Sequence, residues 1–268
     1  MIFCDTHAHL NDVSIIDLLD ELLLNARAAG VQKIVIPATD RKTSEDIIRL
    51  TATRPDVFSA VGIHPNDSAK AAPDDWDAVV ELTRTELANG NAGKIVAIGE
   101  SGLDRYWDDA PMEVQLDFLN RHLNLAREFD LPIILHCREA EDDLIPALQA
   151  YRQKTGWMKG ILHSFSSDVH NLELYLELGL YVGFGGMITY KQKKFDPVRD
   201  AAFAAPLDRI LIETDCPYLT PSPMRGKVEF NQSAYVVHTA QKLAEIKKTT
   251  LEEIANATTE NAVRLLRI

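Results

Sequence analysis

Two histidines separated by one residue, His7 and His9 in the segment DTHAH, are spaced to bind one metal ion. Side chains at positions i and i+2 of an extended chain project to the same side, so both imidazoles can reach a common point. The spacing alone is a weak signal. It gains weight because His136 ends the apolar run LPIILH and His163 ends GILH. Four imidazoles at the ends of apolar runs indicate a metal centre.

Two carboxylates end apolar runs in the same way, Glu100 in IVAIGE and Asp215 in ILIETD. A carboxylate at such a position is costly to bury unless a cation or hydrogen bonds compensate for the lost water. An ion pair would also satisfy either residue, and a helix cap would satisfy Asp215. Beside four histidines, we interpret both carboxylates as metal ligands.

The mixture of imidazole and carboxylate suits zinc or manganese better than calcium, an ion that prefers oxygen ligands throughout. Six ligands are too many for one catalytic ion that keeps a position open for water, whereas two ions sharing a carboxylate would use them all. Glu100 is the predicted shared ligand. The sequence thus predicts a two-metal site with the ligands His7, His9, Glu100, His136, His163 and Asp215.

Strand alternation separates the neighbours of these ligands into two groups. Asp5 and Glu213 share the parity of the ligands and are predicted to orient them from behind. The three cysteines each lie beside an inward-facing group and are predicted to pack away from the metals. Their odd number and the lack of CxxC spacing also argue against disulfides and a cysteine zinc site. They are Cys4, Cys137 and Cys216.

Eight short apolar, β-rich runs that alternate with helical patterns must position these residues. The alternation indicates βαβ units around a parallel sheet. Eight strands, each followed by a helix, favour a single (β/α)8 TIM barrel over residues 1–268, with its active site at the C-terminal ends of the strands. A doubly wound open sheet is the alternative. The predicted strands are residues 2–7, 33–37, 57–64, 94–100, 132–136, 160–163, 180–184 and 209–215, and helices are predicted at 15–30, 112–129, 234–247 and 251–266.

Length and charge restrict the class of protein. The 268 residues suit one barrel-sized domain. With no signal-peptide core and no apolar run of about 18 residues, we expect a soluble, cytoplasmic protein without membrane contact. A formal charge of −12 argues against a protein that coats long nucleic acid, because such binders carry broad basic surfaces. An anionic substrate would be held locally, by metals and a few cations.

Several motifs cover nearly the whole chain: DTHAHLN, GIHP, AIGESGLD, PIILHCREAED, LHSF, ILIETDCPYLTP and RGK. Together they resemble those of the TatD family of metal-dependent deoxyribonucleases, in the wider amidohydrolase-like superfamily of metallo-dependent hydrolases. The resemblance implies the same six metal ligands. It also implies two divalent ions, magnesium, manganese or zinc, and hydrolysis of phosphodiesters in DNA by exonuclease or endonuclease action.

The chain departs from the family pattern at two places. After RGK it reads VEFNQS, with extra residues and with Ser233 where the family usually has proline. Cys4 stands where an aliphatic or aromatic residue is usual. The first departure bears on substrate preference, and neither touches the predicted ligands.

Residues outside the ligand set are predicted to contact substrate. His64 ends the third strand and is a candidate for contacting phosphate or holding water, or else is a buried, hydrogen-bonded histidine. Arg138 shares the parity of His136 and is a candidate partner for a phosphate oxygen, unless it pairs with a rim carboxylate such as Asp142. Arg105 is a further candidate cation for the substrate, and it precedes two aromatic residues, Tyr106 and Trp107. A base could stack on these rings, or the rings could pack on the protein surface.

We therefore predict an exonuclease acting on single-stranded or frayed DNA ends, with RNA as a further substrate, in which Asp215 is both metal ligand and general base. The first alternative is a hydrolase of C–N or C–O bonds, such as an amidase, deaminase or lactonase. Many of those bridge their metals with a modified lysine at the end of a mid-barrel strand, whereas here Lys94 opens the fourth strand and Glu100 closes it. A non-enzymatic metal-dependent binding module is the second. The sequence does not define the oligomeric state, and a monomer is compatible with it.

Overall fold

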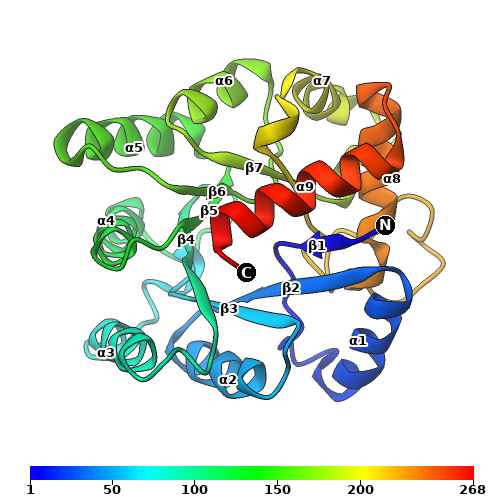
Figure 1. The fold of residues 1–268 in the computed structure, drawn as a ribbon. Helices are drawn as coiled ribbons and strands as arrows, with labels where there is room; N and C mark the ends of the chain where they lie inside the picture. Colours follow the sequence, from blue (N-terminus) through cyan, green and yellow to red (C-terminus); the bar gives the residue numbers. More distant parts are fainter. The chain divides into compact units, whose positions relative to one another are not determined.

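The computed structural model describes all 268 residues, and strands alternate with helices along the chain (Figure 1). The strands are β1 (Phe3–Asp5), β2 (Val31–Pro37), β3 (Val57–Val61), β4 (Ile95–Asp104), β5 (Ile133–Arg138), β6 (Gly160–Leu162), β7 (Tyr181–Phe184) and β8 (Ile210–Ile212). The helices are α1 (Leu19–Ala28), α2 (Arg41–Ala52), α3 (Asp75–Ala88), α4 (Met112–Glu128), α5 (Glu141–Thr155), α6 (Val169–Glu177), α7 (Asp196–Ala204), α8 (Val236–Lys247) and α9 (Leu251–Leu266).

The strands form one sheet in the order β1 to β8, with parallel pairing. Backbone hydrogen bonds also join the first strand to the last. Thr6 N–H donates to Ile212 O at 3.2 Å, and Asp215 N–H donates to His7 O at 2.9 Å. A parallel sheet whose two ends are joined, with a helix after each strand, is a (β/α)8 TIM barrel. The predicted fold is confirmed, and the open doubly wound sheet is excluded.

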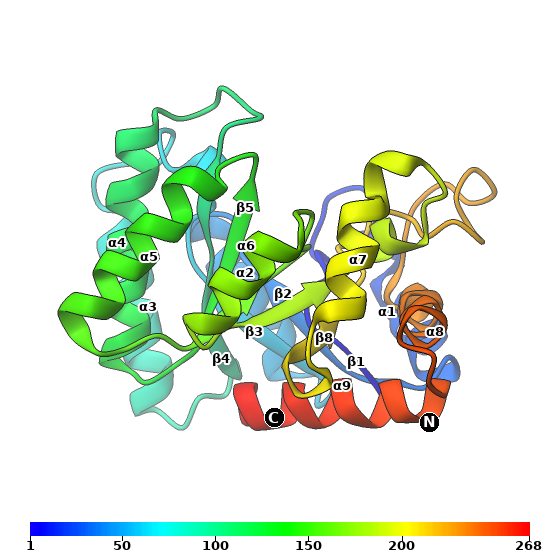
Figure 2. The ribbon, with the colours of Figure 1, turned by 90° about the horizontal axis from the view of Figure 1, so that it is seen from above.

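The chain divides into two compact units, and the first contains residues 1–36, 163–176 and 181–268. Within it, α9 packs against β1 and β8 (Figures 1 and 2). Thr259 Oγ1 donates to Ile2 O at 2.9 Å, and the Asn261 side-chain amide donates to Ile210 O at 2.8 Å. These bonds hold the N-terminal ends of the two strands that lead to His7 and Asp215.

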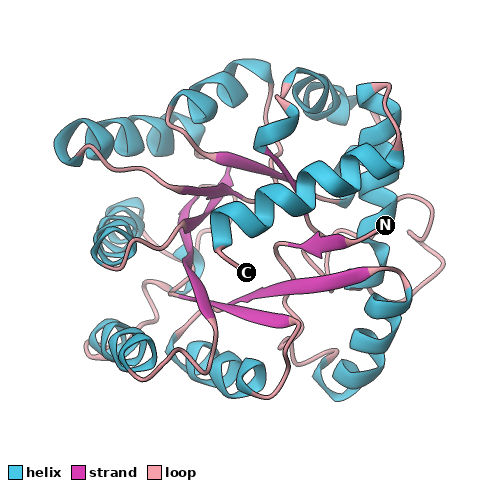
Figure 3. Ribbon diagram, viewed as in Figure 1, coloured by secondary structure: helices cyan, strands magenta, loops and turns pink.

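The second unit contains residues 37–162 and 177–180. Its strands β3 to β6 are accompanied by the helices α2 to α5 (Figure 3). In α4 the buried residues Leu119, His122, Leu123 and Ala126 follow the i, i+3, i+4, i+7 spacing of a helix with one apolar face. That stripe is the pattern from which the helix over 112–129 was predicted.

Strand β4 is buried along its whole length and contains an irregularity. Ile98 pairs with Ile133 and Ser101 with Leu135, so β4 advances three residues while β5 advances two. Beyond this bulge β4 runs on to Asp104 instead of ending at Glu100. Gly102 permits the close approach of β5, because a Cβ added there would lie 2.0 Å from His136 O.

All eight predicted strands are present, but their ends differ from those predicted. Strands β1, β3 and β8 stop before His7, His64 and Asp215, so these residues lie in short segments just beyond the C-terminal strand ends. Regular strand pairing ends earlier than the apolar pattern does, and only single backbone bonds, such as the one from Asp215 N–H to His7 O, continue beyond it. No helix of the structure has the length and apolar character needed to cross a membrane.

Candidate metal centre

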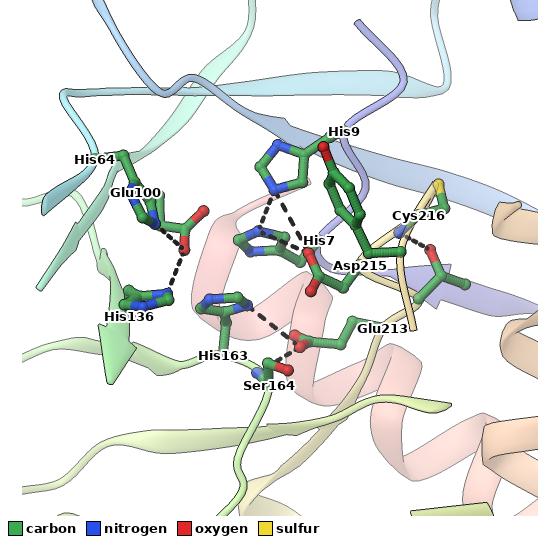
Figure 4. A network of polar contacts seen from close by, with 12 residues as sticks. His7, His9, His64, Glu100, His136, His163, Ser164, Glu213, Asp215 and Cys216 are labelled. Atoms are coloured by element: carbon green, nitrogen blue, oxygen red, sulfur yellow. Dashed lines mark hydrogen bonds and ion pairs between the residues drawn. The ribbon is translucent and has the colours of Figure 1, made fainter. Parts of the chain in front are cut away.

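Three potential ligand atoms converge where β1 and β8 end, in the first unit (Figure 4). The Nε2 atoms of His7 and His9 are 3.2 Å apart. Asp215 Oδ1 lies 3.8 Å from His7 Nε2 and 3.5 Å from His9 Nε2. Four tetrahedral bonds of about 2.0–2.2 Å place their ligand atoms roughly 3.4 Å apart. This first cluster, His7, His9 and Asp215, therefore has the spacing of three ligands around one divalent ion.

Backbone pairing between the two strand ends positions the first cluster. Ala8 forms a parallel bridge with Cys216, and His9 N–H donates to Cys216 O at 2.8 Å. This pairing keeps the segment extended, so that residues 7 and 9 face the same side. Asp215 follows with a φ of +55°, in the left-handed region, and its carboxylate points toward the two rings (Figure 4).

The Asp215 carboxylate is ionised in this setting. Burial would raise its pKa, but the hydrogen bond with His9 and the neighbouring rings of His7 and His163 outweigh burial and lower it. The cluster thus offers two imidazole nitrogens and one anionic oxygen to a common point. This donor set fits zinc, manganese or a similar ion, with a further position left for water.

His163 and Glu213 extend the first cluster. The His163 ring stacks on His7 with centroids 3.8 Å apart and planes 10° apart. Glu213 Oε1 lies 3.5 Å from His163 Nδ1 and also accepts a hydrogen bond from Ser164 N–H. A proton on Nδ1, directed at this carboxylate, leaves Nε2 with the lone pair that a metal ligand needs. The geometry agrees with the orienting role predicted for Glu213.

Asp5 acts on the backbone next to the cluster. Its carboxylate accepts hydrogen bonds from the Thr214 N–H at 2.9 Å and from the Thr214 hydroxyl at 2.7 Å. Burial is the largest influence on this carboxyl and raises its pKa to about 7. Asp5 therefore orients Asp215 through the preceding residue.

A second cluster lies in the second unit, around the buried carboxylate of Glu100 (Figure 4). Glu100 Oε1 lies 3.0 Å from His136 Nδ1 and 3.4 Å from His64 Nε2. His136 Nε2 lies 2.9 Å from Asp104 Oδ2. A neutral imidazole has only one N–H. If that proton is directed at Asp104, the Nδ1 lone pair faces Glu100 Oε1, an arrangement that fits a shared cation.

His64 is configured as a hydrogen-bond donor to Glu100. Its Nδ1 accepts the Asn66 N–H at 3.1 Å, so the ring proton lies on Nε2, the atom that faces Glu100. Burial is the largest influence on the ring and lowers its pKa, which favours this neutral form. A nitrogen that carries a proton cannot bind a metal ion. The geometry thus supports leaving His64 out of the ligand set and assigns it to Glu100.

Asp104 was not predicted as part of the site. Its Oδ2 contacts His136 and accepts the Asn66 amide at 3.2 Å, while its Oδ1 accepts the N–H groups of Tyr106 at 2.8 Å and Trp107 at 2.9 Å. Burial opposes ionisation, but these bonds outweigh burial and lower the pKa of Asp104 to about 2. A carboxylate behind a ligating histidine fixes its tautomer and ring orientation.

The six predicted ligands are therefore distributed over two groups. His163 accompanies the first cluster, and Glu100 and His136 belong to the second.

The two arginines predicted to contact substrate differ in their surroundings. Arg105 donates to both oxygens of Asp143, at 2.5 and 2.8 Å. Arg138 is exposed, forms no ion pair with Asp142, and lies over the Tyr106 ring with 4.6 Å between the guanidinium carbon and the centroid.

None of the three cysteines belongs to either cluster, in agreement with the prediction from strand parity. Cys4 and Cys216 are buried, Cys137 is half-buried, and none forms a disulfide. Burial raises the pKa values of Cys4 and Cys216. Ser233, at the departure from the family pattern, is buried with its Oγ 3.9 Å from Cys216 Sγ. The loop that contains Ser233 thus packs against Cys216, the residue that follows Asp215.

Asn231, in the same loop, is a second residue that sequence reasoning missed. Its side-chain amide donates to Thr214 O at 2.8 Å and to Tyr218 O at 2.7 Å, on both sides of Asp215. These bonds hold the left-handed turn in place. An asparagine in an aperiodic loop carries no signal of such a contact, apart from its place in the segment NQS.

Two curated relatives are metal-dependent hydrolases over the full length of the chain. YabD of Bacillus subtilis is 38% identical over 264 residues and covers 98% of each chain. YcfH of Escherichia coli is 34% identical over 271 residues, covering 100% of this chain and 97% of its own. Both are described as uncharacterized metal-dependent hydrolases. With two clusters of ligand atoms at its strand ends, this chain is a metal-dependent hydrolase built on a (β/α)8 barrel.

The family model described as TatD related DNase matches residues 4–267. The crystal structure of YjjV, a TatD homologue from Escherichia coli K12, superimposes with a TM-score of 0.90 at 30% identity, covering 99% of this chain and 98% of that one. The chain belongs to the TatD family, and the resemblance noted in its motifs is confirmed.

Proposed function

We propose that the chain is a DNA phosphodiesterase that removes nucleotides from single-stranded or frayed ends. The observation that carries the proposal is the convergence of ligand atoms at the strand ends: His7, His9 and Asp215 have the spacing of ligands around one divalent ion, and Glu100 Oε1 lies 3.0 Å from His136 Nδ1. The family model, with its description as a DNase, supports DNA as the substrate.

We further propose that the clusters hold two ions, magnesium, manganese or zinc, with Glu100 as the shared ligand. Bound ions would polarise the phosphate and lower the pKa of water. In the first cluster, Asp215 Oδ1 faces the rings of His7 and His9, which leaves Oδ2 to take the proton of the attacking water. His64 would hold Glu100 in place through its Nε2 proton and present its remaining edge to the phosphate.

Arg138 is the proposed phosphate contact on the protein side. It is exposed at the end of β5, two residues after His136, and its donors are not taken up by a carboxylate. Arg105 stays a prediction as a substrate contact, since Asp143 holds its guanidinium in a fork. The cytoplasmic location, RNA as a further substrate and a monomeric state stay predictions as well.

No structural observation favours the rival hydrolase of C–N or C–O bonds. Lys94 lies just before the N-terminal end of β4. Its ammonium group donates hydrogen bonds to Arg54 O, at 2.9 Å, and to Thr51 O. It is therefore remote from the strand end at which a bridging lysine would have to lie. A carboxylate, Glu100, occupies that end.

A substrate panel tests the proposal. The purified protein, saturated with manganese or magnesium, is incubated with single-stranded DNA, duplex DNA, RNA, a lactone and an amide. We expect hydrolysis of single-stranded DNA that a chelator abolishes and added metal restores. The binding that cations such as Arg138 contribute through phosphate contacts should weaken with salt. Hydrolysis of the lactone or amide without any phosphodiester cleavage would contradict the proposal.

A further inference from the structure

Two large aromatic side chains are exposed side by side directly after β4. Tyr106 is 50% exposed and Trp107 is 56% exposed. Their rings contact each other edge to face, with centroids 4.8 Å apart. Burying such rings is a major source of stability, so an exposed pair in contact is available to a ligand.

The backbone under this pair is held by the second cluster. Asp104 Oδ1 accepts the N–H groups of both Tyr106 and Trp107, and Asp104 Oδ2 contacts His136 Nε2. One carboxylate therefore ties the aromatic pair to a ring of the second cluster. A surface held in this way loses little conformational entropy when a ligand binds.

A cation without a carboxylate partner completes the group. The Arg138 guanidinium lies over the Tyr106 ring at 4.6 Å and forms no ion pair, whereas the neighbouring Arg105 is held by Asp143. An arginine stacked on an aromatic ring keeps its N–H edge free to donate to a phosphate oxygen. Trp107 is followed in the sequence by two carboxylates, Asp108 and Asp109, of which Asp109 pairs with Lys70 at 3.2 Å. Carboxylates repel a phosphate, so Arg138 is the group expected to hold it.

We propose that Tyr106, Trp107 and Arg138 form a nucleotide subsite, in which an unpaired base stacks on the exposed rings and Arg138 pairs with a phosphate of the same strand. The proposal rests on the proposed nuclease function and adds the source of its strand preference. A base inside a duplex has both faces covered by its neighbours, whereas an unpaired base has a face free to stack. The subsite thus selects single-stranded or frayed ends.

The test combines a protein substitution with a substrate substitution. Trp107→Ala should raise the KM for a single-stranded oligonucleotide about 5- to 150-fold, with a smaller effect on kcat, and Trp107→Phe should restore most of the affinity. An abasic residue at the stacked position should weaken binding to the wild type by a similar factor. It should weaken binding to Trp107→Ala much less, because ring and base belong to one contact. Arg138→Ala should reduce the salt dependence of binding by about one phosphate contact.

Arg121 on α4 provides a control cation, because it also lies over an aromatic ring, Phe118 at 5.2 Å, but is paired with Asp117 at 2.7 Å. Arg121→Ala should leave KM and the salt dependence at wild-type values. Two results would overturn the subsite and leave the nuclease function standing. One is an abasic residue that weakens binding as much in Trp107→Ala as in the wild type. The other is an unchanged KM in Trp107→Ala.

If no phosphodiester were hydrolysed, the proposed function would fail, and the subsite would be judged by binding alone. The probe is then quenching of tryptophan fluorescence by the oligonucleotide, compared between the wild type and Trp107→Phe. Quenching that is present in the wild type and lost in the variant supports the subsite. Equal quenching, or none, overturns it.

Discussion

Asp104→Asn removes one negative charge and leaves the side-chain shape almost unchanged. Asp104 has four hydrogen-bond partners: Oδ2 contacts His136 Nε2 at 2.9 Å and accepts the Asn66 amide at 3.2 Å, and Oδ1 accepts the N–H groups of Tyr106 and Trp107. Asparagine has one acceptor oxygen and one donor amide. If the oxygen stays with the backbone, the amide faces the His136 N–H, donor against donor. The His136 ring then loses the contact that fixes its tautomer.

The loss of metal-binding free energy expected in Asp104→Asn can be estimated in two ways. A hydrogen bond to a charged group contributes about 1.5–3 kcal/mol. Removal of a partner behind a metal ligand typically lowers metal affinity about 10- to 100-fold, or roughly 1.4–2.7 kcal/mol. The two ranges agree. The pKa of Asp104 is lowered to about 2, so this carboxylate is charged at every pH at which the enzyme would be assayed, and the loss should not depend on pH between about 5 and 8.

The assay is a metal titration. The apo protein is titrated with manganese, and the concentration that gives half-maximal hydrolysis is compared between the wild type and the variant. We expect this concentration to rise about 10- to 100-fold, while turnover at saturating metal falls much less. Asp143→Asn is the control, because it breaks the Arg105 pair on the same rim without touching His136. Equal metal affinity in Asp104→Asn and the wild type would refute the assigned role.

Three further predictions concern Glu100 as the proposed shared ligand, Asp215 as the proposed proton acceptor, and a buried histidine. Glu100→Gln should lower the occupancy of both ions in elemental analysis; loss of neither, or a single ion to begin with, would remove the two-metal arrangement. Asp215→Asn should keep the fold, because asparagine readily adopts the φ of +55° found there, while turnover at saturating metal falls about 100- to 10,000-fold; near-normal turnover would exclude Asp215 as the base. Burial lowers the pKa of His122 from 6.5 to about 4, and its Nε2 accepts Ile63 N–H at 2.9 Å. The unfolded chain therefore takes up this proton first. The contribution of neutral His122 to the free energy of unfolding is complete above pH 6.5. It falls by about 2 kcal/mol by pH 5 and by about 3 kcal/mol by pH 4. Urea unfolding across this range should show that loss in the wild type and not in His122→Gln.

The parts of the site that sequence could locate are those with a periodic signal. His136 and Glu100 end or interrupt runs of apolar residues, and a barrel strand is apolar up to the point where its side chains reach the active-site end. His7 and His9 could be paired from their spacing even though both lie beyond β1, because the bridge at Ala8 keeps their backbone extended. Local spacing was sufficient at these positions.

Asp104 lacked any such signal. The segment GESGLD has two glycines and polar residues, a composition typical of turns, so the fourth strand was predicted to end at Glu100. In the structure it pairs with β5 as far as Asp104. The bulge between Ile98 and Ser101 adds a residue, and beyond it the alternation counted from the start of the strand no longer gives the direction of a side chain. Register of this kind depends on the neighbouring strand and cannot be obtained from the strand itself.

The contacts of Asp5 with Thr214 join residues 209 positions apart, and the first cluster joins residues almost as distant in the sequence, from His7 to Asp215. A growing chain on the ribosome therefore carries His7 and His9 for most of its synthesis without the carboxylate that completes the cluster. A divalent ion bound by all three residues would act as a cross-link across one of the longest loops that this chain can close, and would stabilise the folded state by mass action. A chain released before β8 has been made lacks Asp215 and therefore cannot complete the first cluster.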